Sequence, residues 1–244
     1  MNNNIHIEPN FGVFIGSFDN NKIHQHYAIQ WSIALGEPIE IIDEVNNSSF
    51  EESVLIKSNV LHQFRCSSHH LLLLFSPISQ IGHLLQQQSS TDIVEYRSEL
   101  SKKMQSLGID YIERKQSFSD FISSIKKAFK EFSSNYSNNN QIEDDRIAKA
   151  LKFLEQNTDR VIPANELAKY CYLSESRFLH LFKEKTNITY RQAQLWIKIS
   201  QSIPKLFTQK ITETAYEFGF TDSAHYSKVF KQNFGFSPKV FSKL

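Results

Sequence analysis

The chain has 244 residues with a formal net charge of +1, and its 20 Phe stand against only 7 Gly and 6 Pro. This length allows two domains with real cores, and the composition excludes a low-complexity chain. The longest apolar run, residues 71–75, is too short to span a membrane, and the amino terminus lacks the pattern of a signal peptide, which together predict a cytoplasmic protein without a membrane partner.

Charge is divided unevenly along the chain. Residues 144–244 carry 16 Lys and Arg against 10 Asp and Glu, a net charge of +6, whereas residues 1–143 carry 11 against 16, a net charge of −5. The C-terminal part is therefore the half suited to the phosphate backbone of a nucleic acid. A modest basic charge can, however, have no role beyond solubility. Cys66 and Cys171 lie in different halves without metal-ligand spacing and are predicted to be reduced, buried thiols.

Residues 5–80 are predicted to form β-structure. Short apolar or alternating runs at 12–16, 29–35, 39–42 and 53–56 are separated by Asn, Ser, Gly and Pro, and many short strands of this kind indicate a sandwich or barrel. From residue 78 the apolar spacing becomes helical, with Tyr96 included in the helical pattern. These helices could pair with a second copy of the chain or pack against their own barrel, and the sequence leaves both open.

A polar segment separates the two halves. Residues 133–141 lack apolar periodicity and predict a flexible linker at 133–143, between a domain at 1–132 and a second domain at 144–244. Asp144 and Asp145 then open a helix, where negative charge suits the positive end of the helix dipole. Further on, residues 190–207 predict one long connecting helix, although Pro204 falls inside it and an interior proline kinks a helix.

The most informative stretch is residues 211–231. Ile211, Ala215 and Phe218 have helical spacing, Gly219 follows where a helix ends in a left-handed residue, and Asp222 can cap the next helix. That next helix has an apolar stripe of Tyr226, Val229 and Phe230. Two short helices joined by a tight turn, the second with a polar outer face, define a helix-turn-helix unit.

The same arrangement occurs once more upstream. Its apolar stripes consist of Leu167, Ala168 and Cys171 on the first helix and Phe178, Leu181 and Phe182 on the second. Phe178 pairs with Tyr226 at an offset of 48 residues, whereas Ala168 pairs with Ala215 at 47, so the second turn holds one extra residue. A duplicated unit of this size is an internal repeat.

These motifs resemble the DNA-binding domain of the AraC/XylS family of transcriptional regulators over about residues 147–241. The resemblance is carried by Leu167-Ala168, Leu173-Ser174, Phe178, Phe182-Lys183, Ala215, Gly219-Phe220, Ser223, Tyr226-Ser227, Val229-Phe230-Lys231, Phe234-Gly235 and Ser237-Pro238. It implies an α+β fold class, with an N-terminal cupin-like β-barrel or jelly roll, trailing helices, and a C-terminal all-α domain of two helix-turn-helix units joined by a long helix. The resemblance implies that the protein is a sequence-specific DNA-binding transcription regulator that reads two successive major grooves. It implies no enzymatic activity and no cofactor.

The resemblance also implies which residues face DNA. On the two recognition helices these are Ser176, Arg177, His180, Ser223, Ala224 and Lys228. Arg177 and Lys228 could donate to guanine O6 and N7, with a phosphate contact or exposure to water as the alternatives. Thr189 and Ser237 open the helices after each unit, where they could help to hold a phosphate or act as plain N-caps. Lys198 stands where the family commonly has Arg, and Ser202 where it has Ala, so a packed ion pair there is in doubt.

Three histidines of the N-terminal half are candidate ligand-binding residues. His24, His26 and the distant His62 are similar in order to the H-x-H segment and later histidine of the family's cupin-like sensor halves, over about 75 residues. Cupin enzymes add a carboxylate and hold a metal, but Gln, Trp and Ser occupy that region at 30–32, so no metal is predicted. Structural hydrogen bonding and a role as donors in a ligand pocket are the two remaining interpretations.

The sequence is compatible with three classes of function. The first is the regulator, with double-stranded DNA as partner, a small-molecule effector in the N-terminal barrel, and RNA polymerase and a second copy of the chain as further candidate partners. The second is a cupin-type metalloenzyme with a fused DNA-binding tail. The third is a scaffold protein, which would bind every duplex equally at fixed salt.

Overall fold

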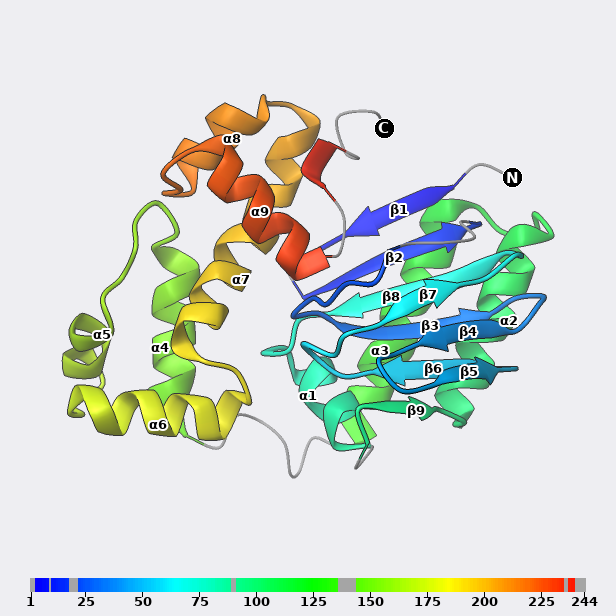
Figure 1. Cartoon of the computed structure of the whole chain (residues 1–244), viewed down its shortest axis with the longest axis horizontal. Coiled ribbons are helices and arrows are strands. Elements are labelled where there is room, and N and C mark those ends of the chain that lie inside the picture. The colour runs from blue at the N-terminus through cyan, green and yellow to red at the C-terminus, as the bar shows by residue number, and fades with distance from the viewer. Residues whose placement is uncertain are drawn as a thin grey trace.

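The computed structural model describes residues 3–8, 10–17, 22–88, 91–135, 144–234 and 237–239. The N-terminal half is built from strands with helices behind them, and the C-terminal half is helical (Figure 1). The strands are β1 (Asn4–Ile7), β2 (Phe11–Gly16), β3 (Ile29–Ala34), β4 (Ile39–Ile42), β5 (Asn47–Phe50), β6 (Ser53–Ile56), β7 (Gln63–Arg65), β8 (His70–Phe75) and β9 (Ile93–Glu95). The helices are α1 (Gln80–Gln87), α2 (Glu99–Ile112), α3 (Phe118–Asn135), α4 (Asp145–Gln156), α5 (Ala164–Tyr170), α6 (Glu175–Thr186), α7 (Tyr190–Ser202), the 3-10 helix η1 (Ile203–Phe207), α8 (Ile211–Glu217) and α9 (Ser223–Phe234).

The N-terminal strands form two antiparallel sheets. The larger sheet has the order β1-β2-β8-β3-β6-β9 and the smaller one β5-β4-β7. Ile39, Ile41 and Phe64 of the smaller sheet fill the space between the two sheets together with Val54 and Ile56 of β6, and all five are buried. The sandwich of short strands and the α+β fold class predicted from the sequence are therefore confirmed.

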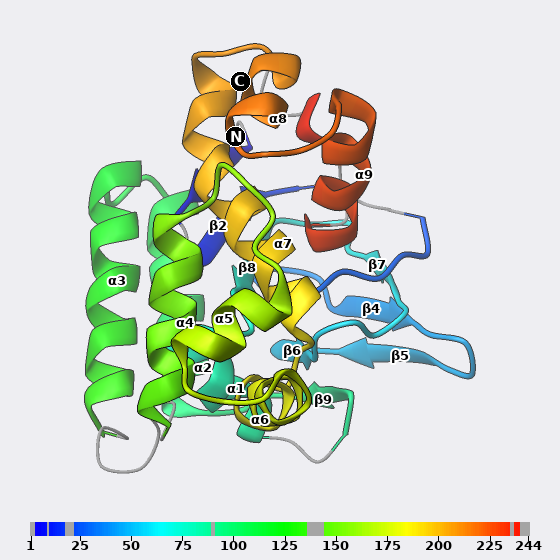
Figure 2. The ribbon, with the colours of Figure 1, turned by 90° about the vertical axis from the view of Figure 1, so that its left-hand side faces the viewer.

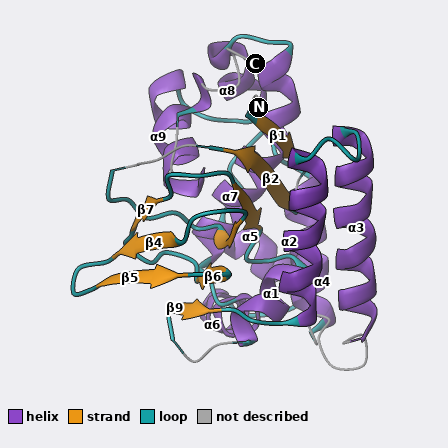
Figure 3. Ribbon diagram, turned by 90° about the vertical axis from the view of Figure 1, so that its right-hand side faces the viewer, coloured by secondary structure: helices purple, strands orange, loops and turns teal. Residues whose placement is uncertain are grey.

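Helices α1, α2 and α3 cover the outer face of the larger sheet, as the side views show (Figures 2 and 3). The apolar stripe of α3 supplies Phe121, Ile125 and Phe129, and the ring of Phe129 meets Phe75 of β8 edge-on at 5.2 Å. Of the two arrangements that the sequence left open, these helices thus pack against their own sheet. The helical assignment of Tyr96 was wrong. The β-branched residues 93 and 94 belong to β9, which ends just before Tyr96 and pairs with β6.

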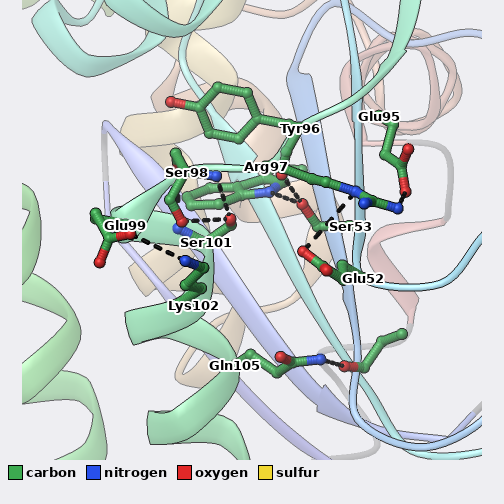
Figure 4. A network of polar contacts seen from close by, with 12 residues as sticks. Glu52, Ser53, Glu95, Tyr96, Arg97, Ser98, Glu99, Ser101, Lys102 and Gln105 are labelled. Atoms are coloured by element: carbon green, nitrogen blue, oxygen red, sulfur yellow. Dashed lines mark hydrogen bonds and ion pairs between the residues drawn. The ribbon is translucent and has the colours of Figure 1, made fainter.

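A polar network fixes the start of α2 against the sheet (Figure 4). Ser53 accepts a hydrogen bond from the indole of Trp31 at 3.1 Å and donates to the carbonyl of Tyr96 at 2.5 Å. Two residues further on, Ser98 caps α2 in a reciprocal capping box with Ser101. Because buried hydroxyl and indole groups must be hydrogen-bonded, this chain of contacts sets where β9 ends and α2 begins.

The junction between the halves follows the prediction only in part. Helix α3 continues to Asn135, three residues into the predicted linker, and residues 136–143 of that linker lie outside the described residues. Asp144 caps α4 by accepting from the backbone N–H of Arg146 at 3.0 Å. The domain limits at 132 and 144 stay predictions.

The long connecting helix predicted to reach Phe207 was wrong in its last turn. The α-helix ends at Ser202 and continues as the 3-10 helix η1, with Pro204 in its first turn. Proline has no N–H to donate to the carbonyl four residues back and its ring crowds that carbonyl, so the backbone tightens to the 3-10 form.

The two halves share one apolar cluster. Leu72 and Leu74 of β8 and Ala28 belong to the same buried cluster as the side chains of α7, η1, α8 and α9. A backbone hydrogen bond of 3.2 Å from the N–H of Tyr27 to the carbonyl of Gln232 ties the end of α9 to the segment before β3. In the described residues, no helix is long and apolar enough to cross a membrane.

The backbone conformation of the turn between α8 and α9 leads us to predict that replacing its glycine lowers the stability of the fold. Gly219 has φ +64°, and a Cβ there would lie 2.3 Å from the carbonyl oxygen of Asp159. We expect Gly219→Ala to lower the free energy of unfolding by about 1–3 kcal/mol, measured by urea denaturation. Gly12→Ala is the control, because outside its chain neighbours its added Cβ would find the nearest heavy atom, in the side chain of Ile7, at 3.7 Å. Equal losses in the two variants would contradict this account of the turn.

Candidate nucleic-acid interface

The first helix-turn-helix unit consists of α5 and α6. Its turn is closed by the N–H of Leu173, which donates to the carbonyl of Ala168 at 2.9 Å, and Tyr172 between them has φ 56°. Ser174 caps α6 by accepting from the N–H of Arg177 at 3.3 Å. The apolar side of α6 is buried, and the predicted contact residues Ser176, Arg177 and His180 are all exposed.

The second unit repeats this geometry in α8 and α9. The N–H of Phe220 donates to the carbonyl of Ala215 at 2.9 Å, and Gly219 takes the left-handed place that Tyr172 has in the first unit. Asp222 caps α9 by accepting from the N–H of His225 at 2.7 Å. Two turns with the same hydrogen bonds, 47 residues apart, support the internal repeat that the sequence pattern predicts.

The outward face of α9 is smaller and less charged than that of α6. Ala224 and Lys228 are exposed, and Ser223 is half-buried at the first turn. His225, which the helical spacing also places on the outward side, lies half-buried with its ring 5.4 Å from that of Phe220. On α6, by contrast, His180 lies 3.7 Å from Glu184, so part of that face carries negative charge. Lys228 is therefore the clearest basic group on the second face and Arg177 on the first.

The two residues predicted to hold phosphate differ in their surroundings. Thr189 caps α7 in a capping box: its hydroxyl accepts from the N–H of Gln192 at 3.3 Å, and the Gln192 side chain accepts from the N–H of Thr189 at 2.8 Å. Ser237 is half-buried and accepts from the N–H of Lys239 at 3.4 Å. Both therefore act as local caps, and their contact with phosphate stays a prediction.

The second unit is fastened to α7 by the two residues that depart from the family pattern. Ser202 exchanges a hydrogen bond of 2.7 Å with the buried hydroxyl of Tyr226. Lys198 is buried, its Nζ donates to the carbonyl of Gly219 at 3.4 Å, and it lies 5.7 Å from the centre of the Phe220 ring. Burial lowers the pKa of Lys198 to about 8, an effect that the charge of Asp159 only partly offsets.

The three histidines of the N-terminal half lie together. His24 and His62 form an isolated antiparallel bridge, and the ligand nitrogens of His24, His26 and His62 all lie within 4.8 Å of one another. Gln30, four residues after His26, contacts both buried rings through its side-chain oxygen. The sequence placed Gln30 near this site, but only the fold shows that it bridges the two histidines.

The two recognition helices are far from parallel in this conformation. Helix α6 runs across the view in Figure 1 and is seen end-on in Figure 2, whereas α9 slopes in Figure 1 and stands upright in Figure 2. Exposed polar faces on the second helices of two helix-turn-helix units define the class of this region, a double helix-turn-helix domain.

Comparison with known proteins agrees with that class. Residues 167–243 match the family model described as a helix-turn-helix domain. The chain is 31% identical over 97 residues to an uncharacterized HTH-type transcriptional regulator of Pseudoalteromonas carrageenovora, and 36% identical over 81 residues to the Msm operon regulatory protein of Streptococcus mutans. These matches take up 40% and 32% of this chain but only 58% and 29% of the two relatives.

The fold of the whole chain is similar to that of ToxT from Vibrio cholerae. The apo crystal structure of a ToxT variant matches with a TM-score of 0.60 at 18% identity, covering 95% of this chain and 96% of that one. The structure of unsaturated fatty acid bound ToxT matches with a TM-score of 0.59 at 17% identity, covering 97% and 96%. The C-terminal region is a helix-turn-helix domain, as its motifs predict, joined to a sheet-rich N-terminal region in a fold similar to that of ToxT.

The burial of Lys198 predicts a pH-dependent difference in stability. Since its pKa is lower in the folded chain than in the unfolded one, the unfolded state holds more protons above about pH 8, and stability rises with pH there. We therefore expect Lys198→Met to be more stable than wild type at pH 7, and this advantage to shrink by on the order of 1 kcal/mol by pH 9. Urea unfolding of both proteins at each pH measures it. A pH-independent difference would mean that Lys198 titrates normally.

Proposed function

We propose that this chain is a sequence-specific, non-enzymatic transcription regulator that binds double-stranded DNA through α6 and α9. The observation that carries the proposal is the duplicated unit, in which two recognition helices expose Arg177 and Lys228 while the same apolar stripe anchors each of them. An α-helix fits the major groove, and side chains near its N-terminal end reach the base edges. The net charge of +6 on residues 144–244 favours the phosphate backbone around those contacts.

Binding to two successive grooves requires the recognition helices to realign. Grooves on one face of a duplex are one helical turn apart, roughly 34 Å, and present themselves in the same direction. We infer that the conformation described here is a resting state in which α9 is held by the apolar cluster around Leu72 and Leu74. DNA binding then selects a minor conformation in which α9 has left the sheet, so the strength of that contact sets the apparent affinity.

A small-molecule effector would fit best between the halves rather than inside the sandwich. The space between the sheets is filled by buried side chains, whereas a cleft of about 450 Å³ lies between α1, α4 and the end of α6. Lys152 and Lys185 line this cleft with Ile78 and Leu151, and the acidic Asp145 and Glu155 belong to the same lining. We propose an amphipathic ligand whose anionic end pairs with the two lysines. ToxT, the protein with the similar fold, has been crystallised with an unsaturated fatty acid bound, which supports an effector of this chemistry.

The remaining partners belong to the same proposal. A regulator of this kind would act in the cytoplasm and would contact RNA polymerase or a second copy of itself when bound at a promoter. The exposed faces of α2 and α3 are available for self-association, because only their inner faces are used by the sheet.

The direct test is loss of a groove contact. We expect Lys228→Ala to weaken binding to the specific site by about 1–3 kcal/mol, because a base or phosphate contact is lost from the second groove. The site is first obtained by selecting bound fragments from random duplex DNA, and affinity is then measured by fluorescence anisotropy at fixed salt. Lys102→Ala is the matched control, since Lys102 is also exposed but lies on α2, where it pairs with Glu99, outside both recognition helices.

The selection has its own decisive outcome. Enrichment of no sequence, with equal affinity for all duplexes, would favour the scaffold class over the regulator. Unchanged affinity in Lys228→Ala would remove that residue from the interface without touching the rest of the proposal.

The resting-state idea predicts a variant that binds DNA more tightly. Ala28→Leu adds volume to the cluster shared with α9, and overpacking of this kind costs about 1–3 kcal/mol. We expect this variant to bind DNA several-fold more tightly. The substitution destabilises the conformation in which α9 packs on the sheet, and it does not affect the conformation in which α9 has left the sheet. Ala34→Leu overpacks the same half in the separate cluster between the two sheets, which contains no residue of α9, so it should leave DNA affinity unchanged. Equal effects of both variants, or weaker binding by Ala28→Leu, would show that docking does not restrain α9.

A further inference from the structure

The histidine cluster is assembled by strand-like pairing before β3. The N–H of His24 donates to the carbonyl of His62 at 2.9 Å and the reverse bond is 2.8 Å, which brings the two rings to a centroid distance of 4.6 Å. His26 follows two residues later, on the same side of an extended chain, with its ring 5.2 Å from that of His62. Two buried imidazoles and one half-buried imidazole are thereby held together.

In each of the three rings, Nδ1 is hydrogen-bonded to the backbone, and Nε2 is left with a lone pair that could bind a metal ion. Each Nδ1 lies 2.9 Å from a backbone carbonyl, those of Lys22, Ala28 and Val60. A carbonyl can only accept, so each Nδ1 must carry the proton. A neutral imidazole that is protonated at Nδ1 carries no proton at Nε2, so each ring presents the lone pair of that atom.

Gln30 adds a further lone pair to the same space. Its Oε1 lies 3.1 Å from Nε2 of His26 and 3.3 Å from Nε2 of His62, while its amide nitrogen donates to Ser32 at 3.1 Å. Three acceptors without a proton between them repel one another, unless a cation lies among them or the amide is rotated. Two ligands of a four-coordinate metal ion at 2.0–2.1 Å are about 3.4 Å apart. The Gln30 oxygen already has this spacing from two rings, and the histidine nitrogens lie within 4.8 Å of one another.

We propose that His24, His26, His62 and the side-chain oxygen of Gln30 bind one divalent transition-metal ion of the type that prefers imidazole, with zinc as the best fit. Neutral imidazoles whose other nitrogen donates to a carbonyl are the usual form of metal-bound histidine, because that bond fixes the tautomer and ring orientation. His24, the half-buried member, provides the side from which the ion enters. As the least buried of the three rings it is the one freest to move, and a pair at the 4.8 Å limit would have to close by about 1.4 Å to reach ligand spacing.

The site lies beside the second recognition helix. Burial is the main cause that lowers the pKa of His24, and the charge of Lys231 on α9 adds to that effect, so Lys231 lies close enough to act on the cluster. The Tyr27–Gln232 backbone bond lies one residue after His26 and one residue after Lys231. A bound dication would repel Lys231 and weaken the docking of α9. This step rests on the proposed function: metal binding would release the reader and tighten DNA binding.

The metal site is tested on the full chain without DNA. Chelator-treated protein is titrated with Co²⁺, whose visible spectrum reports four-coordinate binding, and Zn²⁺ is then added to displace it. We expect one equivalent to bind, and His24→Ala to weaken binding at least tenfold. Gln30→Glu should tighten it, because a carboxylate replaces a neutral oxygen. His83→Ala, which removes a histidine from α1 outside the cluster, is the control.

His24 is chosen because it is only half-buried, so its removal is compatible with folding, which circular dichroism checks. Failure to bind Co²⁺, or equal binding by wild type and His24→Ala, overturns the site and leaves a hydrogen-bonded cluster with a rotated Gln30 amide. On the selected DNA, Zn²⁺ should raise the affinity of wild type several-fold and that of His24→Ala not at all. If metal binds but DNA affinity stays constant, the coupling to α9 is wrong and the site stands. If no DNA sequence is bound under any condition, the proposed function fails, while the Co²⁺ titration still decides the site.

Discussion

The contact between α9 and the larger sheet is the interaction on which the rest of the structure depends. Phe230 and Tyr226 of α9 lie in one buried cluster with Trp196 of α7 and with Leu72 and Leu74 of β8. The core of the second helix-turn-helix unit is therefore completed by the N-terminal half. Because apolar burial is worth about 25 cal/mol per Å², separating these surfaces is costly, and any ligand that acts on the separation must supply a comparable difference in binding free energy.

Both recognition helices meet the N-terminal half at the same end. Lys185 and Thr186, at the end of α6, line the cleft against α1, and Gln232, near the end of α9, is hydrogen-bonded to Tyr27. The beginnings of the two helices, which carry Arg177 and Ala224, stay exposed. The N-terminal half can thus contact both recognition helices without covering the residues proposed to contact DNA. What such contacts change is the angle between the helices, not the chemistry of their faces.

The parts of this molecule that could be predicted from sequence are those set by local spacing. The apolar stripes of α6 and α9, the caps at Ser174 and Asp222 and the turn at Gly219 all depend on residues close in the chain. The shared cluster could not be predicted, because Leu72 in a continuous apolar run gives no sign of which helix will cover it. Strand β9 was missed for the same reason: three residues carry too little periodicity to outweigh the helical spacing around them.

Tyr172 shows how far the repeat can diverge while its geometry stays fixed. It adopts φ 56° where the second unit has Gly219 at φ 64°, and non-glycine residues in this region cost of order 1–3 kcal/mol. The first unit accepts this cost because the buried residues of its core all come from the C-terminal half, with α4 and α7 packing on α5 and α6, and only the partly buried Ile78 of the N-terminal half packs against them. The second unit has no such closed core, since its cluster extends into the sheet. A glycine at its turn removes backbone strain from the second unit, which would lose part of its apolar core if α9 left the sheet as proposed. The difference between the two turns therefore fits a first recognition helix that is fixed and a second one that moves.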